Sequence, residues 1–209
     1  MIYVLIFMTG LVMGRITLFS LDKFWNCSVK ILNKFPLLEL SSAVIYLGIF
    51  YLFGINLAAI FYSLLFSSLL VITLTDLKYY LIPNSIVFGL LILGLAFHLT
   101  TRPFNFLNAA LSFILAGVFF LILQIFSGGG MGGGDIKLIS ILGLWFGFPG
   151  IALIIFISAL IGSVIGIILI MMKFKNRKQG LPFGPFIVFA TLIVFLVGDQ
   201  IWALYLKAF

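Results

Sequence analysis

Apolar residues fill long uninterrupted runs of this chain, and charged residues separate the runs. Five stretches contain no Asp, Glu, Lys or Arg: 40–75, 79–101, 103–134, 138–172 and 179–198. A helix crosses the hydrocarbon core of a bilayer with about 20 apolar residues. The first, third and fourth of these runs are longer than one crossing needs, so each is expected to contain or end in a turn.

Residues that break helices occur where those turns are needed. Gly54-Ile55-Asn56 interrupts the first long run, the glycine-rich segment 128–134 ends the second, and Phe148-Pro149-Gly150 divides the third. The pattern therefore predicts an all-α fold, a polytopic membrane bundle of about eight transmembrane helices at 2–20, 38–53, 57–75, 84–99, 106–126, 136–148, 151–172 and 184–205. The sixth of these helices is short, so a partly re-entrant segment and seven full spans stay open as an alternative.

Composition agrees with this membrane fold and excludes a soluble one. Of the 209 residues, 64% are hydrophobic and 8% are charged, and the mean hydropathy is +1.37. A soluble domain needs far more polar residues to cover its surface, so lipid must be the solvent for most of this chain. We predict one membrane-embedded domain over residues 1–209.

The basic residues indicate the orientation of the helices. With eight spans and both termini outside, ten basic residues fall on the inner side: Arg15, Lys23, Lys30, Lys34, Lys78, Lys137, Lys173, Lys175, Arg177 and Lys178. Only Arg102 and Lys207 fall on the outer side. This asymmetry follows the positive-inside rule and favours an even number of spans in a cytoplasmic membrane, with lipid as a partner. Because the basic residues are dispersed among loops, we expect no nucleic-acid partner.

Metal and thiol chemistry have little support in the sequence. Cys27 is the single cysteine, so neither an intramolecular disulfide nor a thiolate zinc site is expected. His98 is the single histidine and lies near the outer end of the fourth predicted helix, where we interpret it as marking the lipid interface. We therefore predict no metal site.

Two aspartates lie where an acidic side chain next to an apolar span suggests function. Asp76 ends the third predicted helix and Asp135 begins the sixth, and the topology places both at the inner face. Each is followed two positions later by a lysine, Lys78 or Lys137, so an alternative is a pair of ion pairs that fix helix ends. Of the other acidic residues, Asp22 and Asp199 read as solvated or interfacial, and Glu39 as a helix-start carboxylate.

The segment before Asp135 favours the functional interpretation. Residues 127–134 read Ser-Gly-Gly-Gly-Met-Gly-Gly-Gly, and such a loop lets another backbone approach closely because glycine has no side chain. A phosphate-binding loop would continue with Lys and then Ser or Thr, whereas Asp135 takes that place and would repel phosphate. Nucleotide binding is therefore disfavoured.

Two carboxyl groups within hydrogen-bond reach do not both ionise, so the pair shares one proton. The ionised member then takes a proton from a water molecule that attacks a peptide carbonyl, and the protonated member polarises that carbonyl. Asp135 begins a helix, where the dipole stabilises negative charge, and Asp76 ends one. On this ground we assign the proton to Asp76.

Three motifs resemble those of a known family of membrane aspartyl proteases. Gly-Met-Gly-Gly-Gly-Asp-Ile-Lys-Leu at 130–138 resembles the second catalytic motif of the bacterial type IV prepilin peptidases, a Gly-x-Gly-Asp family. Asp76 with Ile82-Pro83-Asn84 resembles the first motif, and Leu181-Pro182-Phe183-Gly184-Pro185 resembles the stretch that opens the last helix. The resemblance covers about residues 35–205. It implies catalysis by Asp76 and Asp135, and substrate contacts by Gly132, Gly133, Gly134, Lys78, Lys137, Pro182, Phe183, Gly184 and Pro185.

The same resemblance implies a substrate and a place of action. Members of the family cleave prepilins and pseudopilins after the glycine that ends a basic leader, at the cytoplasmic face of the inner membrane. Many members also carry a cytoplasmic insert with two Cys-x-x-Cys pairs and methylate the new N-terminus. Here the segment 21–37 is short, so zinc is not expected. S-adenosylmethionine is implied only if methyl transfer is retained.

Two other functions remain as alternatives. A small proton- or cation-coupled transporter would use the same aspartates, but its acidic residues would be expected near the bilayer midplane in broken helices. A related archaeal preflagellin peptidase or a signal-peptide-cleaving relative is the other alternative. The glycines before Asp135 and the segment 181–185 favour the bacterial prepilin type.

Overall fold

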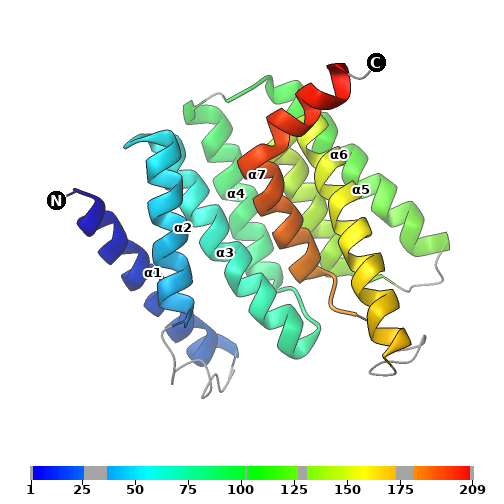
Figure 1. Ribbon diagram of the computed structural model, residues 1–209, viewed down its shortest axis with the longest axis horizontal. Helices are drawn as coiled ribbons and strands as arrows, with labels where there is room; N and C mark the ends of the chain where they lie inside the picture. The colour runs from blue at the N-terminus through cyan, green and yellow to red at the C-terminus, as the bar shows by residue number, and fades with distance from the viewer. Residues whose placement is uncertain (1, 26–36, 102, 127–130, 173–180, 208–209) are drawn as a thin grey trace. The chain divides into compact units, whose positions relative to one another are not determined.

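The computed structural model describes residues 2–25, 37–101, 103–126, 131–172 and 181–207, and these residues form helices joined by short connections (Figure 1). The helices are α1 (Ile2–Trp25), α2 (Leu37–Phe53), α3 (Leu57–Tyr79), α4 (Asn84–Thr101), α5 (Phe106–Phe126), α6 (Gly133–Met171) and α7 (Gly184–Lys207). Five of them, α3 to α7, are long and apolar enough to cross a membrane. The prediction of an all-α membrane bundle is confirmed.

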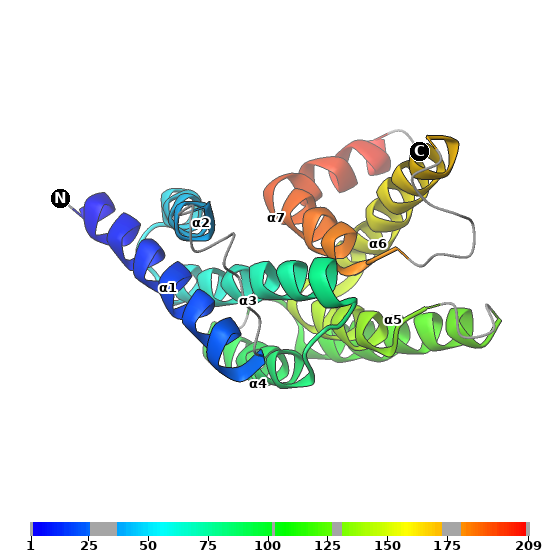
Figure 2. The same cartoon turned by 90° about the horizontal axis from the view of Figure 1, so that it is seen from below.

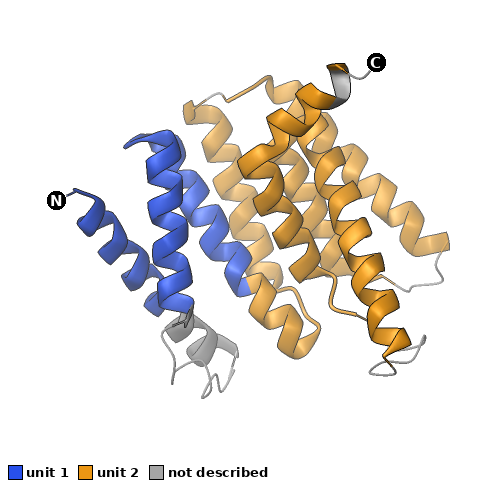
Figure 3. Cartoon of the chain, in the orientation of Figure 1, with its two compact units in different colours: residues 1–71 blue, residues 72–209 orange. Residues whose placement is uncertain are grey.

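The chain divides into two compact units, residues 1–71 and 72–209, which Figure 3 colours separately. The boundary falls within α3, so residues 57–71 of that helix belong to the first unit and its last turns belong to the second. The prediction of a single domain over the whole chain stays a prediction. Most of the segment 21–37, including Cys27, lies outside the described residues.

In the first unit, α1 and α2 pack with their backbones in close contact. A Cβ atom built on Gly10 would lie 2.6 Å from the Cα atom of Ala43, and one built on Gly14 would lie 2.6 Å from the Cα atom of Glu39. Small residues four positions apart allow this approach between membrane helices. Arg15 donates to Glu39 at 2.9 Å, so Glu39 is ion-paired as well as placed in the first turn of α2.

The breaks between helices occur at the predicted residues. Gly54 follows α2 with a φ of +71°, a conformation that favours glycine, and the side chain of Asn56 accepts the N–H of Ala59 to cap α3. Pro83 precedes α4, where its missing N–H removes no helical hydrogen bond. Asn105 accepts the N–H of Leu107 at the start of α5.

The predicted sixth and seventh helices form one element, α6, with an irregular break. Gly147 has φ 59° and ψ −172°, and Phe148 has φ −94° and ψ 130°. α6 thus contains two helical segments, one on each side of Gly147 and Phe148, so the described residues form seven helices with one break where eight separate helices were predicted. The predicted interruption at Phe148-Pro149-Gly150 is nevertheless where the helix bends.

The break reverses the direction of α6. A straight helix would place residues 135 and 166 about 46 Å apart. Yet Asp135 interacts electrostatically with Asp76, Asp76 accepts a hydrogen bond from the first residue of α7, and Gly166 lies against Leu181 just before α7. Both ends of α6 therefore lie near the start of α7. Figure 2 shows the second half of α6 beside α7, and α5 lies on the side of α6 away from α7.

Asn108 of α5 holds the break in α6. Its side-chain nitrogen donates to the carbonyl of Phe148 at 3.0 Å, and its oxygen accepts the N–H of Phe148 at 2.9 Å. Ser112 donates to the same oxygen. The amide thus provides hydrogen-bond partners for two backbone groups of the interrupted helix. Backbone groups without such partners cost on the order of several kcal/mol each in a membrane.

Asn108→Ala is expected to lower the free energy of unfolding by about 2 kcal/mol, because both backbone groups of Phe148 lose their partner. Thermal unfolding in detergent micelles measures the effect. Thr100→Ala is the matched control, since Thr100 is exposed and bonds to carbonyls of its own helix. A loss for Asn108→Ala no larger than that of the control would contradict the role of this amide.

The first half of α6 is the core of the second unit. Trp145 is fully buried, stacks on Phe97 with ring centroids 5.2 Å apart, and donates its indole N–H to the carbonyl of Leu90 at 3.1 Å. Gly94 makes room for this indole, because a Cβ atom there would lie 2.8 Å from the Trp145 nitrogen. The core thus fixes α6 against α4.

His98 lies in this core, and its predicted place at the lipid interface is wrong. The side chain is buried, and Nε2 lies 2.8 Å from the carbonyl oxygen of Leu144. The rings of Phe97, Phe104 and Phe106 pack around the imidazole. The position of a residue near a helix end does not show which face of the helix it occupies. His98 lies on the face of α4 that packs against α6.

Candidate active site

Asp76 lies in the last turn of α3 and is buried, with 5% of its surface exposed. Its Oδ2 accepts a hydrogen bond of 2.8 Å from the backbone N–H of Gly184, the first residue of α7. A Cβ atom at position 184 would lie 2.7 Å from this oxygen, closer than a side chain allows. Glycine is therefore required for α7 to begin directly against Asp76.

Asp135 lies in the first turn of α6 and is also buried, with 8% of its surface exposed. Its N–H donates to the carbonyl of Gly132 at 3.1 Å. Within the described part of the chain, its Oδ1 is buried and has no hydrogen-bond partner. An unpartnered carboxyl oxygen is costly to bury, and at a functional site it is a position that water or substrate can occupy.

The two carboxyl groups interact electrostatically, so α3, α6 and α7 converge on one site. Two carboxyls that interact in a buried place do not both carry a full charge, and they titrate as a pair. Such a pair can supply both a proton acceptor and a proton donor. This is the arrangement that general acid–base catalysis needs.

The assignment of the proton to Asp76 from helix dipoles loses its basis. Asp135 stands at the N-terminus of α6, as expected from the sequence. Asp76 ends α3 but also receives the first N–H of α7, a second helix N-terminus that the sequence alone did not reveal. Each carboxyl therefore has a helix N-terminus beside it, and the dipole argument no longer distinguishes them.

The three glycines before Asp135 have three different surroundings. Gly132 lies against the carboxyl group, since a Cβ atom there would be 3.1 Å from Asp135 Oδ2. A Cβ atom on Gly133 would meet nothing within 4 Å, so this residue borders open space. Gly134 packs on Ile82, where a Cβ atom would lie 2.8 Å from the Ile82 Cβ.

Gln124 anchors the glycine segment and was missed by the sequence analysis. Gln124 lies in the last turn of α5, and its side-chain nitrogen donates to the carbonyl of Met131 at 2.9 Å. This places the backbone just ahead of Gly132. The signal in the sequence was weak: Gln124 is a polar residue within the otherwise apolar end of a membrane helix.

The two lysines lie at the same end of the second unit and are exposed. Lys78 places its ammonium 5.2 Å from the ring centre of Tyr79. Lys137 donates to the side chain of Asn84 at 2.9 Å. An ion pair that merely fixes the start of α6 would join Lys137 to Asp135, so the contact with Asn84 counts against that alternative for this helix.

The segment before α7 positions the start of this helix next to Asp76. The ring of Phe183 lies against Gly162 in the second half of α6 and meets the ring of Phe186 edge to face. Pro182 and Pro185 flank it, and a proline in the first turn of a helix removes no helical hydrogen bond.

Among the described residues, no three His, Cys, Asp or Glu side chains come together in a way that could hold a metal ion.

Comparison with known proteins supports the family suggested by the motifs. A model of the type IV leader peptidase family matches residues 63–167, a range that contains both aspartates. The "Prepilin leader peptidase/N-methyltransferase" of Bacillus subtilis (strain 168) is 34% identical over 91% of this chain and 77% of its own length. The proteins of that name from Stutzerimonas stutzeri and Pseudomonas aeruginosa are 33% and 36% identical, each over 87% of this chain.

The chain spans 64% of the length of the last two relatives. No solved structure matches it. The family match covers half of the chain, and the Bacillus subtilis relative is matched over most of its length. Together with the buried aspartate pair on multiple apolar helices, these findings show that the chain is a multi-pass membrane protein that belongs to the type IV leader peptidase family.

Proposed function

We propose that this protein is a membrane aspartyl endopeptidase that removes the basic leader from type IV prepilins or pseudopilins. The observation that carries the proposal is the buried pair of carboxyl groups, Asp76 and Asp135, in a chain of the leader peptidase family. The names of its relatives supply the substrate class. No other pair of buried acidic side chains exists in the described residues.

The proposed chemistry is hydrolysis by one water molecule. The ionised carboxylate takes a proton from the water molecule while the oxygen of that water bonds to the scissile carbonyl carbon. The protonated carboxyl donates its proton to the carbonyl oxygen. When the tetrahedral intermediate collapses, the carboxyl group that took the proton from water donates it to the amide nitrogen, and the other carboxylate recovers its proton from a hydroxyl group of the intermediate. The products are a leader with a new carboxyl group and a mature chain with a new amine.

Burial of the pair supports this chemistry. With 5% and 8% of their surfaces exposed, Asp76 and Asp135 lie in a largely buried place, where charges interact more strongly than in bulk water. Asp76 is held by the Gly184 N–H, and Asp135 keeps one oxygen without a hydrogen-bond partner among the described residues. The attacking water would bind at that oxygen.

The site is proposed to face the cytoplasm. Lys78 and Lys137 lie at the aspartate end of the second unit, and the inner side of a membrane protein carries the excess of basic residues. A basic leader stays on that side for the same reason, while the apolar segment of the substrate enters the bilayer. Both termini of this chain would then be outside.

Methyl transfer is part of the relatives' name and is a separate question. The groove between α4 and α5 is largely apolar, and Lys137 is the one charged residue among the described residues that line it. It does not fit S-adenosylmethionine, because none of these residues is acidic and could meet the sulfonium or amino group. The described residues that line a second groove along α5 are apolar apart from two asparagines and a serine. We therefore derive no methyl-transfer step.

Co-expression of a prepilin with this protein tests the proposal. Membranes are analysed by intact mass, and a prepilin with the glycine before the cut replaced serves as control. We expect loss of the leader at one bond for the first substrate and none for the second. An uncut prepilin would refute the proposal and is the result that a transporter predicts. A mass increase of one methylene on the product would report methyl transfer.

A further inference from the structure

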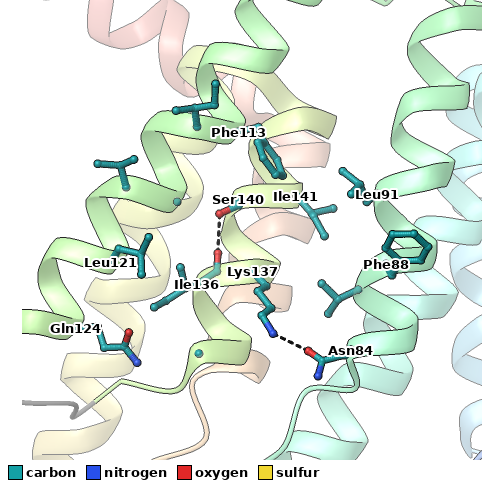
Figure 4. Close-up of a pocket in the computed structure, with 15 residues that line it drawn as sticks. Asn84, Phe88, Leu91, Phe113, Leu121, Gln124, Ile136, Lys137, Ser140 and Ile141 are labelled. Atoms are coloured by element: carbon teal, nitrogen blue, oxygen red, sulfur yellow. Dashed lines mark hydrogen bonds between the residues drawn. The ribbon is translucent and has the colours of Figure 1, made fainter.

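An apolar groove of about 740 Å³ runs between α4 and α5, with the first half of α6 as its floor (Figure 4). We call it the α4–α5 groove. Its walls are Phe88 and Leu91 of α4 and Val118 and Leu121 of α5, and Ile136 and Ile141 come from the floor. Phe88, Val118 and Leu121 are between 46% and 62% exposed, so this face has no partner within the described chain.

One end of the groove is polar, and it is the end where the aspartates lie. Asn84, Gln124 and Lys137 line it, and Figure 4 shows Lys137 reaching Asn84 across its mouth. Lys137 and Asn84 have more hydrogen-bonding groups than the bond between them uses: lysine has three donors, and the amide of Asn84 has two donors besides its acceptor. They can bind the backbone of a peptide that leaves its helix there, which needs partners at membrane depth.

Asp135 is not a wall of the groove, because its side chain leaves α6 on another side. Lys137 projects into the groove, and residues two apart on a helix differ by about 200° in direction. A chain that lies in the groove reaches Asp135 only by crossing the N-terminus of α6. Among the described residues, nothing lies within 4 Å of a Cβ atom built on Gly133, which lines the groove, and Gly132 beside it touches the Asp135 carboxyl.

A second groove on the same helix lacks this connection. It has a volume of about 670 Å³ and lies between α5 and the later part of α6, with Leu111, Leu115 and Phe119 on its α5 side. Its polar end is formed by Asn105 and Asn108 next to Phe148, far along α6 from Asp135. Apolar lining alone therefore does not single out a substrate site, whereas the connection to Gly132 does.

We infer that the α4–α5 groove binds the apolar helix of the substrate, and that the residues around the cut unwind and pass over Gly133 and Gly132 to the aspartates. This inference rests on the proposed function and adds the place where the substrate helix docks. An acyl chain would satisfy the apolar walls equally well. A lipid phosphate can also accept from Lys137, so the glycine crossing toward Asp135 is the feature that favours a peptide.

Photo-cross-linking in the membrane tests the inference. A photoreactive phenylalanine analogue is placed at Val118 or at Leu115, one helix turn apart on α5 but in different grooves, in the inactive Asp135→Asn background with co-expressed prepilin. We expect the prepilin adduct from position 118 and none from position 115. Adducts from position 115 alone, or with phospholipid alone at position 118, would overturn the inference.

Kinetics on the active enzyme separate this inference from the proposed function. Val118→Trp is expected to raise KM about tenfold with little change in kcat, and Leu115→Trp to change neither. If the wild-type enzyme cuts prepilin and Val118→Trp leaves KM unchanged, the groove is not the docking site and the proposed function stands. If the wild-type enzyme does not cut prepilin, the proposed function itself fails.

Discussion

Replacing either Asp76 or Asp135 with asparagine is expected to lower the rate constant of prepilin cleavage on the order of 10³-fold. Asparagine has the shape of aspartate but neither accepts a proton from water nor donates one to the carbonyl, and general acid–base catalysis contributes roughly 10²–10⁴-fold. Single-turnover cleavage by the purified protein in proteoliposomes measures the loss. Melting temperatures within about 4 °C of wild type would show that the fold is retained.

The double variant sharpens this prediction. Because the two carboxyls interact and act as one unit, Asp76→Asn with Asp135→Asn should lose about as much activity as either change alone. Asp199→Asn is the matched control, since Asp199 is exposed near the far end of α7. Losses that multiply, or a variant that keeps more than a tenth of the wild-type rate, would show that the residues do not form a pair.

Gly184→Ala is expected to cost about 10²-fold in kcat, although the residue itself takes no part in proton transfer. The new Cβ atom would lie 2.7 Å from Asp76 Oδ2 and 3.2 Å from its Cγ, so either the carboxyl or the start of α7 must move. The 2.8 Å hydrogen bond from the Gly184 N–H would lengthen with it. A misplacement of about 1 Å costs about this much in a positioned catalytic group.

The control for this change is a glycine with free space around it. Gly89 lies inside α4, and a Cβ atom there meets nothing within 4 Å. Gly89→Ala should therefore keep full activity and gain up to about 1 kcal/mol of stability from helix propensity. If Gly184→Ala raises KM and leaves kcat unchanged, position 184 contacts the substrate, as the family resemblance implies, and does not hold Asp76.

Much of the fold could be predicted because the length of an apolar run and the residues that break a helix act locally. The apolar run after Asn105 predicted a helix at 106–126, and α5 has the same bounds. Gly54 supplies the positive φ of the turn before α3. The irregular backbone of α6 includes Phe148, the first residue of the predicted break. Such signals lie within a few residues of the structure that they determine.

The features that were missed depend on contacts between distant parts of the chain. Gly184 and Asp76 are 108 residues apart, so no local pattern shows that α7 begins at Asp76. The burial of His98 depends on which face of α4 meets α6, and in a uniformly apolar helix the two faces look alike. Asn108 likewise gains its meaning only from Phe148 across the bundle.

We propose that Asp76 and Asp135 hydrolyse the leader bond of a prepilin with one water molecule. The most direct measurement is the mass of both products after the purified protein cuts prepilin in water enriched in ¹⁸O. We predict one ¹⁸O atom in the new carboxyl group of the leader, none in the mature chain, and no products with Asp135→Asn. Products that still form with Asp135→Asn would contradict the claim.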